Sequence, residues 1–249
     1  MIIELFGAPA AGKTMLARQL GARLRREGHS VDVLLSFRPA EVDEQRACSP
    51  ILSPISRLTR PVMERLAAKG PGGGASDTCI LSSALLGILP ARSPMWSLRL
   101  RQYTTRLEVS WRLAERFHGI VIIDQGFVQL VCSLVLLGRA PDQDLAARAL
   151  EMIPHADLLI RLSASPEVLR ARLEARRRGQ GLLERWFELD TETNLRSIRI
   201  VEMLDGILSR QGQPVLRIAG REHGAPPEAI DEIGARIRDG IAVMDRVSP

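Results

Sequence analysis

The chain has 249 residues, of which 45% are hydrophobic and 25% charged. This is ordinary for a globular protein and suits a single domain, residues 1–249. The formal net charge of +5 favours an anionic partner, or it reflects an arginine-rich composition without a ligand. Three cysteines without metal-ligand spacing, and no secretion signal, predict a reducing compartment, so we expect a cytoplasmic protein. The longest apolar stretch, residues 120–138, contains Asp124, Gln125 and Gln129, which argues against a membrane span.

Apolar runs and segments of helical spacing alternate along the chain. The runs are nearly continuous, which predicts a parallel sheet of five strands with helices on both faces, an α/β fold. Residues 38–56 are expected to form a loop, and residues 70–76 to be flexible by composition. We predict strands over 2–6, 31–37, 119–124, 156–162 and 214–220, and helices over 13–27, 58–69, 80–89, 94–117, 127–137, 142–152, 165–178, 182–211 and 226–245. Two of these helices begin with a serine N-cap followed by proline, at Ser93 and Ser165.

The stretch LFGAPAAGKT, residues 5–14, matches the phosphate-binding pattern G-x-x-x-x-G-K-[ST]. Small residues allow backbone N–H groups to surround phosphate oxygens, and the helix that follows directs its positive end at the anion. Lys13, one of two lysines in the chain, would reach the β- and γ-phosphates as a compact charge. The alternative is a glycine-rich turn without a ligand. The expected nucleotide-binding residues are Gly7, Ala8, Pro9, Ala10, Ala11, Gly12, Lys13 and Thr14.

An aspartate ends the buried strand expected at 119–124. In proteins with a phosphate-binding loop, an acidic residue at this place organises a metal ion. We therefore expect Asp124 and the hydroxyl of Thr14 to hold Mg²⁺ for a bound ATP. A helix follows Gly126, so the alternative role for Asp124 is that of a helix cap.

Four stretches resemble the thymidylate kinase and deoxynucleoside kinase group of P-loop phosphotransferases. They are LFGAPAAGKT, IVIIDQGFVQ, DLLIRLSASPEVLRARLEARRRGQ and VLRIAGREHGAPPEAIDEIGARI. The resemblance covers most of the chain outside about 40–118. It implies a P-loop NTPase fold with a helical lid at about 165–190 and an adenine-side loop after the last strand. We also expect a helical insertion at about 57–118, whose part at about 70–95 has no obvious counterpart in this group.

The lid stretch carries a cluster of arginines. Arg172 and Arg176 are four residues apart and share one helix face, and Arg178 extends the cluster. Mobile arginines can stabilise the charge on a transferring phosphoryl group when a lid closes. With Lys13 and Asp124 they form the expected catalytic set. The alternative is a solvated basic face.

The acceptor side departs from the resembled kinases. Gln125 stands where they usually carry an arginine, which puts a nucleoside monophosphate acceptor in doubt. Arg38 could bind an anionic acceptor, and Glu41 or Asp43 could take a proton from a hydroxyl, unless these residues belong to a plain polar loop. Arg106 and Tyr103, on the helix at 94–117, could line the same pocket with Trp111, although aromatics at helical spacing are more often core residues.

The favoured function is an ATP- and Mg²⁺-dependent phosphotransferase acting on a small anionic or hydroxyl-bearing acceptor. The first alternative is an ATP-binding regulatory or assembly protein that uses the same fold as a switch. The second is a nucleic-acid-binding protein or nucleic-acid-end kinase. The chain contains no basic stretch interleaved with aromatic residues, which argues against this alternative. A homodimer is left open, because many members of the resembled group are dimers.

Overall fold

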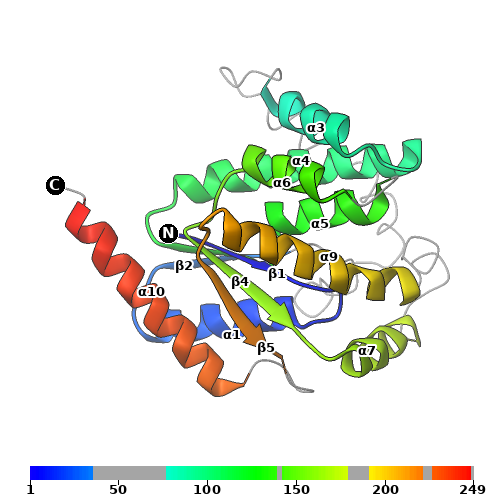
Figure 1. Ribbon diagram of the computed structural model, residues 1–249. Coiled ribbons are helices and arrows are strands. Elements are labelled where there is room, and N and C mark those ends of the chain that lie inside the picture. The colour runs from blue at the N-terminus through cyan, green and yellow to red at the C-terminus, as the bar shows by residue number, and fades with distance from the viewer. Residues whose placement is uncertain (36–76, 139–141, 179–190, 221–225, 248–249) are drawn as a thin grey trace, which may run out of the picture.

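Parallel strands form one sheet in the order β2-β3-β1-β4-β5 (Figure 1). The computed structural model of the protein describes residues 1–35, 77–138, 142–178, 191–220 and 226–247. Within them the sheet has five strands, as the sequence predicts: β1 (Ile2–Phe6), β2 (Val31–Leu34), β3 (Ile120–Ile123), β4 (Leu158–Ser163) and β5 (Val215–Ala219). The second strand ends earlier than expected, at Leu34.

The pattern of burial across the sheet explains the continuous apolar runs. Every residue of β1 and β3 is buried, because these strands lie inside the sheet and carry helices on both faces. The edge strands β2 and β5 are only partly buried. Since all strands are parallel, the carboxyl ends of β1, β3 and β4 meet at one edge of the sheet, which is where ligands bind in open α/β sheets.

Helices cover both faces of the sheet (Figure 1). One layer contains α1 and α10, and the other contains α4, α5, α6 and α9, with α3 outermost against α4 and α6. Helix α7 follows β4 and packs against α9. The bounds are α1 (Lys13–Arg26), α3 (Asp77–Ile88), α4 (Pro94–Glu115), α5 (Phe127–Leu137), α6 (Gln143–Met152), α7 (Pro166–Arg178), α9 (Thr191–Arg210) and α10 (Pro227–Val247).

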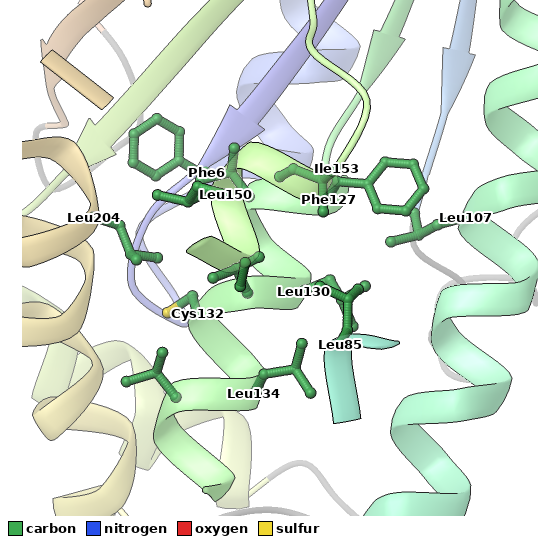
Figure 2. Close-up of a cluster of buried hydrophobic side chains, with 14 of the residues drawn as sticks. Phe6, Leu85, Leu107, Phe127, Leu130, Cys132, Leu134, Leu150, Ile153 and Leu204 are labelled. Atoms are coloured by element: carbon green, nitrogen blue, oxygen red, sulfur yellow. The ribbon is translucent and has the colours of Figure 1, made fainter. Parts of the chain in front are cut away.

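Helix α5 is the centre of the larger hydrophobic core. Most of its side chains are apolar and buried, and it lies between α4 and α9, as Figure 2 shows. Trp111 belongs to this core, with its ring 5.3 Å from that of Phe127 in an edge-to-face arrangement, so it does not line a pocket as considered above. The second core packs the opposite face of the sheet against α1 and α10.

The predicted helix ends are confirmed in detail at two serines. Ser93 caps α4 by accepting a hydrogen bond from Trp96 N, and Ser165 accepts one from Val168 N at the start of α7. The predicted helix at 58–69, the loop at 38–56 and the flexible stretch at 70–76 lie outside the described residues, as does the start of the helix expected at 182–211. In the described part of the chain, no helix combines the length and the apolar character needed to cross a membrane.

Candidate functional site

Strand β1 and helix α1 hold the phosphate-binding loop (residues 7–12) at the carboxyl edge of the sheet. Gly7 has φ +151° and Gly12 φ +103°, a backbone region that disfavours side chains, and Ala10 also has a positive φ of 64°. A Cβ atom at Gly7 would lie 2.2 Å from the carbonyl oxygen of Leu162 in β4. The first glycine of the motif is therefore required by the neighbouring strand as well as by the turn.

Lys13, the first residue of α1, folds its side chain back over this loop. Its Nζ donates hydrogen bonds to the carbonyl oxygens of Gly7 (2.7 Å) and Ala8 (3.0 Å), and the residue is only 7% exposed. The N-cap of α1, Gly12, offers no side-chain hydrogen bond, and the first turn contains no acidic residue. The positive end of α1 and the ammonium group thus act together at the loop, which favours an anion there.

Asp124 and Thr14, the two predicted metal-binding residues, are in direct contact. Asp124 directly follows β3, the neighbour of β1, and is fully buried. Its Oδ2 accepts a hydrogen bond of 2.7 Å from Thr14 Oγ1. The alternative role as a helix cap is not what the structure shows: the N-cap of α5 is Gly126, and another side chain binds the first turn.

The side-chain oxygens of Thr14 and Asp124 are of the kind that could bind Mg²⁺ together with a nucleotide. The described residues contain no group of three or more His, Cys, Asp or Glu side chains that could hold a metal by itself. Mg²⁺ commonly keeps several waters and takes one or two protein oxygens together with substrate phosphates. Thr14 Oγ1 and Asp124 Oδ2 are oxygens of this kind, at the base of the loop.

Glu4, in the middle of β1, is a residue of the site that sequence reasoning missed. Its Oε1 accepts hydrogen bonds from the backbone N–H groups of Val128 (2.6 Å) and Gln129 (3.4 Å), in the first turn of α5. Burial raises the pKa of Glu4 to about 7, although these backbone hydrogen bonds act in the opposite direction. A Cβ atom at Gly126 would lie 2.4 Å from Glu4 Cδ, so the glycine makes room for the carboxylate.

Gln129 is the second missed residue. It lies on α5 and is 7% exposed, and its Oε1 accepts a hydrogen bond of 3.1 Å from the backbone N–H of Gly7. No local sequence pattern indicates the contact of Glu4 with α5 or that of Gln129 with Gly7, because each joins residues more than 120 positions apart in the chain. The only hints in the sequence were one acidic residue within an apolar strand and one glutamine within an apolar helix.

Three of the predicted acceptor-side residues lie together beside Asp124. The hydroxyl of Tyr103 donates a hydrogen bond of 3.2 Å to the carbonyl oxygen of Gln125, and the exposed Arg106 guanidinium stacks 5.9 Å from the Tyr103 ring. Burial raises the pKa of the Tyr103 hydroxyl, and the charges of Glu4 and Asp124 add to this effect. Arg38 and Glu41 lie outside the described residues.

Among the arginines predicted to belong to a lid, Arg172 lies against the loop. Its Nη1 donates to the carbonyl oxygens of Ala10 (3.0 Å) and Ala11 (3.2 Å), so α7 touches the phosphate-binding loop directly. Arg178, at the end of α7, is exposed. The side chain of Arg176 and residues 179–190 lie outside what the structure describes.

An open hollow of about 400 Å³ adjoins the loop at the carboxyl end of β5. A Cβ atom at Gly220, in the wall of the hollow, would lie 3.4 Å from the carbonyl oxygen of Ala11, which places the two side by side. The lining residues are Arg217, Ile218, Ala219, Gly220, Pro226, Glu228, Ala229 and Glu232.

The fold of this site is shared with solved structures. Deoxyadenosine kinase from M. mycoides with bound dATP is similar over 96% of this chain and 100% of its own, with 13% identity and a TM-score of 0.51. The structure of that enzyme with dCMP and dCDP matches over the same shares, with 12% identity and a TM-score of 0.48. The chain matches no protein-family model and no curated protein sequence. The likeness confirms the predicted α/β P-loop NTPase fold.

Proposed function

We propose that the protein is an ATP- and Mg²⁺-dependent phosphotransferase that acts on a small molecule. The observation that carries this proposal is the assembly of Lys13, Thr14 and Asp124 around a loop whose backbone is shaped for phosphate. The contact from Arg172 of α7 to the loop supports a kinase in particular, because positive charge close to the bound phosphates stabilises a transferring phosphoryl group.

Each residue of the loop has a defined task in this proposal. The backbone N–H groups of residues 8–14 and the start of α1 bind the phosphates, and Lys13 exchanges its carbonyl partners for the β- and γ-phosphate oxygens. Thr14 and Asp124 would hold Mg²⁺, which neutralises charge on the phosphates when bound. Arg172, Arg176 and Arg178 would stabilise the transferring group from the lid.

The adenine of ATP is assigned to the hollow at the end of β5. This hollow lies beside Ala11 of the loop, and it falls on the stretch that resembles the adenine-side loop of nucleoside kinases. The acceptor is assigned to the other side of the loop, near Asp124, where Tyr103, Arg106 and Gln125 lie together. Arg106 could bind an anionic group of the acceptor, and Arg38 and Glu41 remain predicted members of this side.

The experiment is an ATP-turnover assay with a broad panel of small hydroxyl-bearing and phosphorylated acceptors. Turnover should rise with the right acceptor and should fall at least a hundredfold in Lys13→Ala and Asp124→Asn. Lys13→Arg keeps the charge but brings a wide planar group into a loop that closes on a compact ammonium, so it should also fail. The exposed Arg148→Ala, on α6, is the control and should match the wild type. Turnover that is unchanged in both Lys13→Ala and Asp124→Asn contradicts the mechanism.

A second candidate function rests on Gln125. The resembled kinases usually carry an arginine at this position, and its replacement by a neutral amide suits an ATP-binding regulatory or assembly protein. In that case Lys13→Ala would abolish binding to a partner, and no acceptor would be phosphorylated. A cytoplasmic location and a homodimer stay predictions from the sequence.

A further inference from the structure

We propose that Glu4 is a positioning residue that shapes the phosphate-binding loop from behind, through the first turn of α5 and the side chain of Gln129. Its importance for ATP binding rests on the proposed function, whereas its effect on the shape of the loop does not. Glu4 lies in β1, three residues before Gly7 at the start of the loop, yet its side chain contacts the loop only through a second element.

The first link is the contact from Glu4 to α5. A helix leaves its first N–H groups without partners, and a capping side chain next to the helix usually binds them. Here Gly126 at the N-cap has no side chain, and Glu4 supplies the acceptor from β1. The fit is close, because a Cβ atom at Gly126 would collide with the Glu4 carboxyl group. Glu4 thereby fixes where α5 begins relative to β1.

The second link returns from α5 to the loop. Gln129 is the third residue of α5, and its amide oxygen accepts the N–H of Gly7 in a buried position. This N–H belongs to the residue with which the loop begins, so its direction determines how the chain leaves β1. With both links in place, Glu4 in β1 and Gly7 just after this strand are tied to the same turn of α5.

The same turn also affects the residue that meets Thr14. Asp124 and Gln125 connect β3 to α5, so the place where α5 begins limits where the Asp124 carboxylate can point. The Tyr103 hydroxyl holds the carbonyl of Gln125 from the outer side. A shift of the first turn of α5 would therefore disturb both the start of the loop and the contact between Thr14 and Asp124.

A glutamine at position 4 separates positioning from charge. It can keep an acceptor oxygen for the N–H of Val128, whereas leucine of similar size removes the acceptor. The other carboxylate oxygen, Oε2, has no hydrogen-bond partner within the described residues. The amide nitrogen of Glu4→Gln at this place therefore breaks no hydrogen bond to them. At position 129, leucine removes the acceptor for Gly7.

The test measures the loop with and without ATP. Amide hydrogen exchange of the peptide covering residues 7–16 is followed without nucleotide, and Mg²⁺-ATP affinity is measured by calorimetry. The variants are Gln129→Leu, Glu4→Leu, Glu4→Gln and the double leucine variant, and the control is Gln143→Leu, the same change at an exposed glutamine of α6.

We expect Gln129→Leu and Glu4→Leu to speed exchange in the loop at least fivefold and to weaken ATP binding about tenfold, which corresponds to about 1.4 kcal/mol. Because both act through one turn, the double variant should be little worse than either single one. In loop exchange and in ATP affinity, Glu4→Gln and Gln143→Leu should match the wild type.

Three results would overturn the proposal. The first is a Gln129→Leu protein with wild-type loop exchange and ATP affinity. The second is a Glu4→Leu protein that loses stability while exchange in its loop stays unchanged, because that is the result expected if Glu4 only caps α5. The third result applies if Glu4→Leu does not fold. In that case, loop exchange in Glu4→Gln that is as fast as in Gln129→Leu would contradict the proposal. A wild-type protein that binds no ATP contradicts the proposed function instead. The exchange data without nucleotide still test whether Glu4 positions the loop.

Discussion

Glu4→Gln should change how the stability of the protein depends on pH. Burial raises the pKa of Glu4 from 4.5 to about 7, so in this range the folded protein keeps a proton that the unfolded chain releases. Rising pH therefore favours the unfolded state: the contribution of Glu4 is fully present below about pH 4.5 and is lost as the pH passes about 7. Glutamine keeps the acceptor for Val128 N and does not titrate.

The expected size follows from the shift. At about 1.4 kcal/mol per pKa unit, the wild type should lose about 3 kcal/mol of unfolding free energy relative to Glu4→Gln across this window. Urea unfolding of both proteins in steps from about pH 4.5 to about pH 8 measures the difference, and groups common to both proteins cancel. A difference that stays flat, or that grows in favour of the wild type with rising pH, would refute the argument that Glu4 is protonated by burial.

Further predictions concern the loop and its supports. Gly7→Ala should abolish ATP binding and lower the melting temperature, because its Cβ would meet Leu162 O at 2.2 Å; calorimetry showing normal binding would contradict this. Thr14→Ala should lose the gain in ATP affinity that Mg²⁺ gives, and Thr14→Ser should keep it, in titrations with and without EDTA; equal behaviour of the two would exclude a metal role for the hydroxyl. Arg172→Ala should raise exchange in residues 7–16 more than Arg170→Ala, its exposed neighbour on α7. Ser93→Ala should cost about 1 kcal/mol in urea unfolding and Ser93→Asp much less, since only the cap is lost.

The fold could be predicted from the sequence because its signals are local. Each strand is a short apolar run, and the serine and proline pairs at Ser93 and Ser165 mark where helices begin. The same holds for the loop: Gly7, Lys13 and Thr14 are read from one short stretch. Asp124 and Thr14 were expected to act at one site, because the carboxyl ends of parallel strands meet at one edge of the sheet. Their side chains are in contact in the structure, and their metal role stays a prediction.

The supports of the loop could not be predicted, because they depend on how distant elements pack. Glu4 is the one charged residue of an apolar strand, and no nearby sequence feature indicates that its hydrogen-bond partners lie in α5. Gln129 was noted only as a polar residue that argues against a membrane span. The close approach of Leu162 O to Gly7 likewise depends on the register between β1 and β4, which no motif encodes.

The deep burial of most of α5 links binding to stability. The helix that holds Gly7 through Gln129 also carries Leu130 and Leu134, which lie in the middle of the larger core (Figure 2). A ligand that tightens the loop should therefore raise the unfolding free energy of that core. By the same thermodynamic linkage, a substitution that opens a cavity deep in the core should weaken ligand binding. Mutations far from the loop can then reduce activity without touching any residue that meets a phosphate.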